Sequence, residues 1–146
     1  MAQFQVRTGR RTEFVNIMDK VQAAVKELGI AAGVVTVFVP HTTAGITINE
    51  NADPDVMRDV DAALERMVPW EAGYRHGEGN AAAHVKASLM GSSVRVLVEG
   101  GRLRLGTWQS IYFCEFDGPR SRNVWVEGER RGESVSGVSS EGNSPT

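Results

Sequence analysis

The spacing of apolar and polar residues predicts three helices in the first two-thirds of the chain. Over residues 12–28, apolar side chains recur three and four positions apart, which is the pattern of one buried helical face. Gly29 follows where helices commonly end in a left-handed residue. A second helix is predicted to begin at Asp53-Pro54, with the aspartate as N-cap, and a third to span residues 80–90.

Strands are predicted around and after these helices. Residues 33–40, GVVTVFVP, are β-branched at both parities, so we expect a central strand that is covered on both faces. Residues 43–49, TAGITIN, alternate like a half-buried strand, and Phe4–Val6 suits a short edge strand. The last third contains four more strand-like stretches: SVRVLVE, GGRLRLG, WQSIYFCEF and NVWVE. Helices early and strands late favour an α+β sandwich over a doubly wound sheet.

Length and composition indicate one globular domain. The chain has 146 residues and a formal net charge of -2, which argues against a nucleic-acid partner. The single cysteine, Cys114, cannot form an internal disulfide, and no segment is typical of a signal peptide or a membrane span, so we expect a cytoplasmic protein without a membrane partner. Residues 128–146 are rich in Ser, Gly and charge, which predicts a disordered tail after a domain of residues 1–127.

Three histidines are the candidate metal ligands. His41 follows the proline that ends a strand, His76 lies in a glycine-rich loop, and His84 falls in the third predicted helix. Three convergent imidazoles could hold a divalent metal and leave one coordination position open. Their spacing matches no compact metal motif, so three unrelated surface or capping histidines are the simpler alternative on spacing alone.

Other polar residues allow two interpretations each. Glu50 could be a general base or a solvated charge at a strand end, whereas Asp53 is better explained as a helix cap. Asn80 could cap the third helix, a position that also directs backbone N–H groups toward an anion.

The last predicted strands end in a second polar cluster. Gln109 and Glu115 share the parity of the apolar residues between them, so both are expected to point inward. An inward carboxylate needs a partner, and Arg120 and Arg122 follow the next turn. The two arginines could form a structural ion-pair network or a clamp for phosphate or carboxylate. Cys114 lies mid-strand without an activating neighbour and is expected to be inert.

Three segments resemble a known family in the expected order. HTTAGITINENADPDV, YRHGEGNAAAHVKASLMG and GRLRLGTWQSIYFCEFDGPRSR are similar to the signature segments of the YjbQ family, also called UPF0047 or secondary thiamine-phosphate synthase. The resemblance covers roughly residues 3–127. It implies a single-domain α+β sandwich of mixed or antiparallel sheet with about three helices, assembled as a homotrimer. It also implies a divalent metal, Zn or Mg, held by His41, His76 and His84.

The resemblance also implies roles for the remaining motif residues. The catalytic set would be His41, Glu50, His84, Glu115 and Arg120, and the ligand-binding set Asn80, Gln109, Asp117 and Arg120. The expected reaction is a weak thiamine-phosphate synthesis that joins a pyrimidine diphosphate to a thiazole phosphate and releases pyrophosphate. The alternatives are a metal-dependent hydrolase of a small phosphorylated substrate and a non-catalytic binder of an anionic metabolite.

Overall fold

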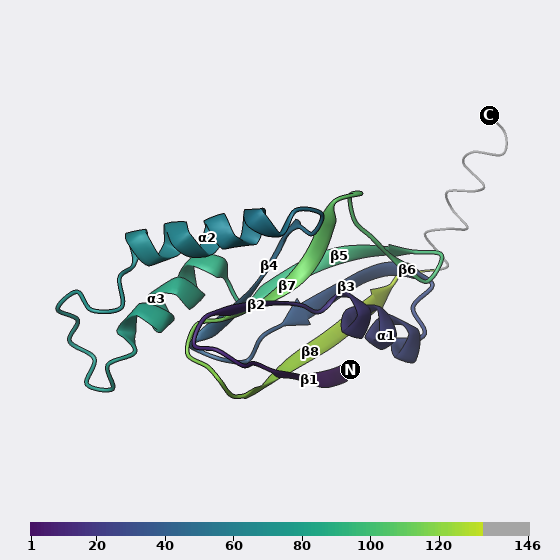
Figure 1. Cartoon of the computed structure of the whole chain (residues 1–146). Helices are drawn as coiled ribbons and strands as arrows, with labels where there is room; N and C mark the ends of the chain where they lie inside the picture. The colour runs from purple at the N-terminus through teal and green to yellow at the C-terminus, as the bar shows by residue number, and fades with distance from the viewer. Residues whose placement is uncertain (133–146) are drawn as a thin grey trace, which may run out of the picture.

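Two antiparallel sheets and three helices make up the described part of the protein, a single-domain α+β fold (Figure 1). The computed structural model describes residues 1–132, so the predicted tail lies outside the described residues from position 133 onward. The elements are β1 (Ala2–Arg7), β2 (Glu13–Asn16), α1 (Met18–Leu28), β3 (Ala32–Phe38), β4 (Ala44–Glu50), α2 (Pro54–Met67), α3 (Ala81–Met90), β5 (Ser93–Glu99), β6 (Arg102–Arg104), β7 (Gln109–Glu115) and β8 (Ser121–Arg130).

The larger sheet has the strand order β1-β8-β3-β5-β6, and the smaller has the order β2-β7-β4. All their ladders are antiparallel. β1 is an edge strand and β3 a central one, as the sequence predicts. The expectation that β3 is covered on both faces is wrong, because Val35 and Val37 are buried while Phe38, on the opposite face, is exposed.

The inner faces of the two sheets pack against each other and form the main core. α1 closes this core with Val21 and Val25. Burial of branched apolar side chains supplies most of the stabilisation here, at about 25 cal/mol for each Å² removed from water. The core residues from the centres of the sheets, none more than 1% exposed, are Val35, Val37, Ile46, Ile111 and Phe113.

α2 and α3 cover the other face of the smaller sheet (Figure 1). Leu64 of α2 and Ala83 of α3 pack against Cys114 and Phe116 at the end of β7. β7 is therefore buried on both faces. Burial raises the pKa of the Cys114 thiol, in agreement with the predicted inert cysteine.

Two boundaries differ from the sequence predictions. The first helix begins at Met18, because residues 13–16 form β2 and pair with β7, with Phe14 opposite Cys114. Phe14 fits the helical spacing, but its partner lies a hundred residues away and leaves no local signal. At the other end, β8 runs to Arg130 and pairs with β3 as far as Gly33, so the boundary predicted after residue 127 falls inside a strand.

Two helix ends follow the predicted local signals, and a third does not. Gly29 is left-handed, with φ 69°, and the Asp53 side chain accepts a hydrogen bond of 2.9 Å from the N–H of Asp55. Asn80 occupies the N-cap position of α3 without making a capping hydrogen bond. Within residues 1–132, no helix is long and apolar enough to cross a membrane.

The close approach of β4 to the end of α3 gives a stability prediction. A Cβ atom on Gly45 would lie 2.7 Å from the carbonyl oxygen of Gly91 and 2.9 Å from Cβ of Met90. Gly45→Ala should therefore lower the free energy of unfolding by about 1–3 kcal/mol through overpacking, measured by urea denaturation. Gly77→Ala is the control, since a Cβ at Gly77 meets no atom within 4 Å. Equal stability of the two variants would contradict the packing.

Candidate functional site

The candidate site is built around a buried ion pair between Glu115 at the end of β7 and Arg122 in β8. The Glu115 side chain is fully buried, and that of Arg122 is 3% exposed. Arg122 donates from Nε to Glu115 Oε1 over 2.8 Å and from Nη2 to Glu115 Oε2. Further hydrogen bonds reach the carboxylate from the Thr8 hydroxyl (2.8 Å) and from the N–H of Asp117 (3.0 Å). Arg122 Nη2 also donates to the Thr43 hydroxyl over 2.9 Å.

This network keeps the Glu115 carboxylate ionised. Burial alone would raise the pKa of Glu115, but hydrogen bonds from Arg122, the Asp117 amide and Thr8, together with the Arg122 charge, outweigh burial and hold the pKa below its usual value. A lone pair of the Glu115 carboxylate that accepts one of these hydrogen bonds cannot also accept one from a ligand. Glu115 is therefore a structural residue of the site, and its predicted catalytic role gains no support from the geometry.

Arg120 differs from Arg122 in its exposure and in its partners. Its side chain is 49% exposed. Nε donates to the backbone carbonyl of Asp117 (3.0 Å) and Nη2 to the Asp117 carboxylate (3.2 Å). Nη1 has no hydrogen-bond acceptor within residues 1–132. Arg122 thus belongs to an ion-pair network, and Arg120 presents part of a fixed guanidinium to solvent.

Asn80 is connected to Arg120 through Asp117. Its Nδ2 donates to Asp117 Oδ2 over 2.8 Å, so the same carboxylate oxygen accepts from both side chains. This contact replaces the predicted cap of α3. The structure therefore brings three residues of the predicted ligand-binding set into one hydrogen-bonded chain.

His41 lies between two open pockets in the connection from β3 to β4. One pocket, of about 510 Å³, is shared with His84 and Ser88 of α3. The other, of about 530 Å³, is shared with Arg120 and Arg122. Burial, followed by the positive charge of Arg122, lowers the pKa of His41. The His41 side chain therefore borders both the pocket beside α3 and the pocket beside Arg120.

His76 and His84 lie against each other on the α3 side. Their rings meet edge to face with centroids 5.1 Å apart, and His76 Nε2 lies 2.9 Å from the Glu78 carboxylate. His84 Nε2 is buried and, among residues 1–132, has no hydrogen-bond partner. Within residues 1–132, however, no group of three His, Cys, Asp or Glu side chains is close enough to hold a metal ion. The divalent metal stays a prediction.

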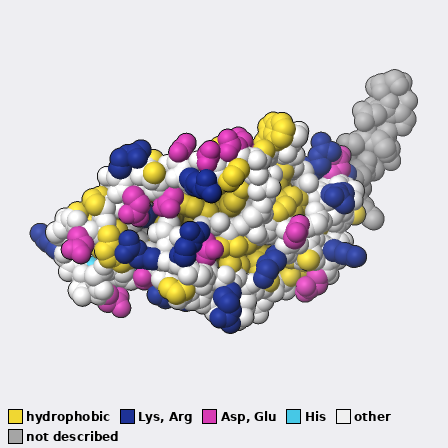
Figure 2. Space-filling model, viewed as in Figure 1, with side chains coloured by type: hydrophobic (Ala, Val, Ile, Leu, Met, Phe, Trp, Pro, Cys, Tyr) yellow, Lys and Arg dark blue, Asp and Glu magenta, His cyan; other side chains and the backbone are white. Residues whose placement is uncertain are grey.

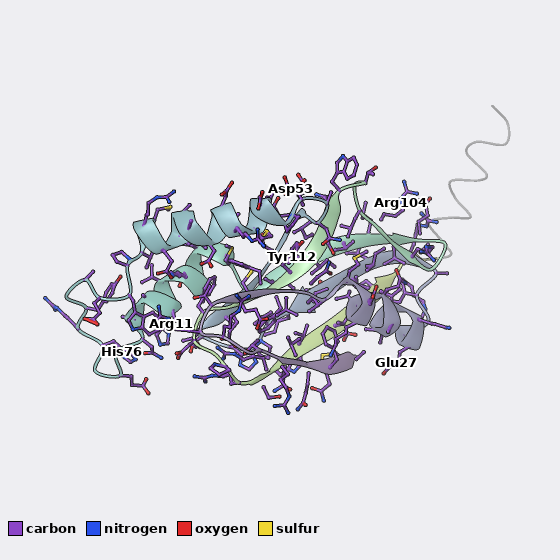
Figure 3. The ribbon with its side chains drawn as sticks, in the orientation of Figure 1. Arg11, Glu27, Asp53, His76, Arg104 and Tyr112 are labelled. Atoms are coloured by element: carbon purple, nitrogen blue, oxygen red, sulfur yellow. The ribbon has the colours of Figure 1, made fainter. Side chains whose placement is uncertain are left out.

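Glu50 and Gln109 lie at the opposite end of the smaller sheet. They pair with each other at one end of the β4–β7 ladder, whereas Ala44, which lines the pocket of His41, pairs with Glu115 at the other. Six residues of strand separate the two ends by about 20 Å. In Figure 3, His76 lies at one end of the molecule, and Asp53, three residues after Glu50, lies at the far end of α2. Gln109 Oε1 accepts from the N–H of Gly106 over 2.7 Å.

Several polar residues of the network carry no sequence signal. Thr8 lies 107 positions from Glu115, and Thr43 lies 79 from Arg122. Thr8 also accepts from the backbone N–H of Arg120 over 3.0 Å, so it joins the buried pair to the exposed arginine. Thr8 and Thr43 stand in connections between strands, where threonine is an ordinary residue.

A second buried cation, Lys86, is also absent from the sequence predictions. Its side chain is 1% exposed and pairs with Glu65 of α2, above the ring of Phe116. Asp61, one turn earlier on α2, has a buried Oδ1 that finds no hydrogen-bond partner within residues 1–132. Burial, followed by the charge of Glu65, raises the pKa of Asp61. The helical spacing of Ala83, Lys86 and Ala87 places the lysine on the inner face of α3, which was the available signal.

Comparison with known proteins agrees with this architecture. The family model described as UPF0047 protein YjbQ-like matches residues 2–129. The UPF0047 protein YugU of Bacillus subtilis is 53% identical over 124 residues, which cover 84% of this chain and 94% of YugU. A UPF0047 protein of Methanocaldococcus jannaschii is 45% identical over 124 residues, covering 85% of this chain and 90% of that protein.

Solved structures give the same result. The crystal structure of a conserved YjbQ/UPF0047 family protein from Clostridium acetobutylicum superimposes with a TM-score of 0.86 at 52% identity, covering 88% of this chain and 100% of that one. A conserved hypothetical protein from Thermus thermophilus gives a TM-score of 0.83 at 45% identity, with 88% and 100% coverage. The chain belongs to the YjbQ/UPF0047 family, as its motifs predict. The names of these relatives specify no reaction.

The buried pair predicts an acid-sensitive loss of stability. Glu115→Gln leaves the Arg122 charge buried without its partner and should cost about 3–5 kcal/mol of unfolding free energy in urea titrations at pH 7. Because the pKa of Glu115 is lower in the folded than in the unfolded chain, its contribution is complete above the unfolded pKa of about 4.3 and is lost as the pH falls through the folded pKa. The variant should lack that part of the acid-induced destabilisation.

Glu99→Gln is the matched control for this measurement. Glu99 pairs with Arg104 over 2.9 Å, but both side chains are more than 60% exposed. An exposed pair contributes about 0–1 kcal/mol, so this replacement should change stability little. Equal losses in the two variants would contradict the dominance of the buried pair.

Proposed function

We propose that this protein binds the phosphate group of a small phosphorylated metabolite between Arg120 and His41. The observation that supports the proposal is that two neighbouring arginines have different partners. The Arg122 guanidinium is hydrogen-bonded to Glu115 and Thr43 within the protein. Asp117, by contrast, binds one edge of the Arg120 guanidinium and leaves Nη1 for a ligand. A guanidinium held in this way recognises phosphate by charge and by geometry.

The other groups at this end suit an anion as well. Thr42 and Ser92 line both pockets of His41 and can donate hydroxyl hydrogen bonds. The Asp117 and Glu115 carboxylates are each paired with an arginine, so their negative charge is balanced. A bound phosphate would therefore meet a fixed cation and neutral donors.

The reaction we propose for this site is the thiamine-phosphate synthesis expected from the family resemblance. Release of pyrophosphate from a pyrimidine diphosphate develops negative charge on the leaving group, and Arg120 would stabilise that charge. His84, whose ring lines the pocket beside His41, is the candidate for moving a proton. A bound divalent metal would neutralise further charge on the leaving group. Because the described residues assemble no three-ligand set, no step is assigned to it.

A non-catalytic binder of an anionic metabolite is the second candidate. Two carboxylates are predicted to act as acid or base. Glu115 is engaged in its ion pair with Arg122, and Glu50 lies at the far end of β4. An anion site with few groups to transfer protons favours binding without turnover. The hydrolase alternative needed Glu50 as a base beside the histidines and gains no support from this placement.

The homotrimer implied by the resemblance stays part of the proposal and is measured by sedimentation equilibrium.

The surface in Figure 2 intersperses Lys and Arg with Asp and Glu and presents no continuous basic area on that face. This surface supports a small-molecule ligand over a nucleic acid.

Replacement of Arg120 tests the anion site. Arg120→Ala should weaken binding of inorganic pyrophosphate by about tenfold to a hundredfold in calorimetry, because hydrogen bonds between charged groups contribute about 1.5–3 kcal/mol. Arg58→Ala is the control, since Arg58 forms a like i, i+3 pair with Asp55 at 3.0 Å, on α2 and outside both pockets. An unchanged affinity of Arg120→Ala for inorganic pyrophosphate would contradict the proposal.

An activity assay on the same preparations separates the two candidate functions. Pyrophosphate release from a hydroxymethylpyrimidine diphosphate in the presence of a thiazole phosphate should fall with the affinity in Arg120→Ala if the protein is an enzyme. Pyrophosphate binding without any turnover by the wild-type protein would support the non-catalytic binder.

A further inference from the structure

The backbone of β8 fixes the orientation of the His41 ring. Nε2 of His41 lies 2.9 Å from the backbone nitrogen of Asn123 and accepts its N–H. Asn123 pairs with Gln5 of β1 on one side, whereas the pairing of β8 with β3 stops at Trp125 opposite Phe38. Continued by two residues, that register would place Pro40 opposite Asn123. The chain turns away there, and the imidazole takes the hydrogen bond that the strand no longer accepts.

This hydrogen bond determines which ring nitrogen carries the proton. A donor N–H needs a lone pair, so Nε2 is unprotonated, and in a neutral imidazole the hydrogen then resides on Nδ1. An Nε2–H tautomer would set two hydrogens against each other at this distance. A flipped ring would set the Asn123 N–H against a carbon. Nδ1 itself has no hydrogen-bond partner within residues 1–132.

A histidine in this state has no lone pair left for a metal. A ligating imidazole coordinates through one nitrogen and donates its other N–H to an acceptor. At His41 the Nε2 lone pair already accepts from the backbone, and Nδ1 carries the hydrogen. His84 differs, because its Nε2 is buried and has no hydrogen-bond partner in the described part of the chain, residues 1–132. The three histidines therefore do not form an equivalent ligand set.

We infer that His41 is a neutral hydrogen-bond donor, locked as the Nδ1–H tautomer by the Asn123 backbone, that contacts an oxyanion of the ligand and does not ligate a metal. The oxyanion part rests on the proposed phosphate site, because His41 lines the pocket that Arg120 also lines. Donor and guanidinium would bind the same anionic group from two sides. In this role His41 favours an oxyanion as the ligand. Its hydrogen bond to the backbone of β8 determines that Nδ1 carries the proton.

Two substitutions separate the nitrogens of His41. His41→Gln places an amide oxygen near the position of Nε2, which preserves the acceptor for Asn123 but removes the donor. His41→Asn places an amide nitrogen near the position of Nδ1, which preserves the donor. We expect the affinity for inorganic pyrophosphate, measured by calorimetry, to fall about tenfold in His41→Gln and less than about threefold in His41→Asn. A comparable loss in both variants, or none in His41→Gln, would overturn the donor role.

Two further measurements test the tautomer and the metal independently of the anion. Long-range ¹H–¹⁵N spectra of histidine-labelled protein, assigned with the variants, should show His41 protonated at Nδ1 and unprotonated at Nε2. The affinity for Zn²⁺ should be the same in the wild-type protein and His41→Gln. An Nε2–H tautomer, or a tenfold loss of Zn²⁺ affinity in His41→Gln, would overturn the inference. If the wild-type protein binds no pyrophosphate, the proposed function and the oxyanion role fail together, while an Nδ1–H tautomer would still exclude His41 from a metal site.

Discussion

The ion pair of Glu115 and Arg122 is the constraint on which the polar end of this protein depends. Two opposite charges are buried between the sheets, and a buried charge is stable only when its hydrogen bonds are satisfied. The hydrogen bonds come from the β1–β2 connection through Thr8, from the β3–β4 connection through Thr43, and from the turn after β7. Segments distant in sequence are thus held together around one ion pair.

The site follows from this arrangement. Thr8 bonds both Glu115 and the backbone of Arg120, so the buried pair also positions the turn that carries the exposed guanidinium. Arg122 is used within the protein and Arg120 faces outward, with Asp117 to orient it. On the other side His41 is fixed by β8. Rigid backbone and a paired core therefore place a cation and a neutral donor beside the same pocket, an arrangement suited to an oxyanion.

The sequence predicts most of the fold because its signals are local. Strand alternation, the αL glycine at position 29 and the Asp53 cap each depend on a few neighbouring residues, and the structure confirms them. The sequence pattern places Phe14 in the helix, because a helical spacing and a short strand both accommodate one phenylalanine. The last residues of β8, Gly128, Glu129 and Arg130, are assigned to the tail because their composition is that of a tail.

The candidate site was predictable in its residue types but not in its distances. The motifs single out Asn80, Asp117 and Arg120, which the fold joins by hydrogen bonds. They cannot show that Glu50 stands a full strand away from His41, since motif order says nothing about strand length in space. Nor can they show which nitrogen of a histidine meets a backbone donor in another strand.

The most direct test of the account is a titration of inorganic pyrophosphate followed by backbone amide NMR. If the anion binds at the polar end, the amide signals of Thr42, Ser92 and Arg120 should shift together and saturate at one affinity. Those of Glu50 and Trp108, at the opposite end of β4 and β7, should stay in place. Saturating shifts centred on Glu50 and Trp108, with Arg120 and Thr42 unmoved, would contradict the assignment of the site.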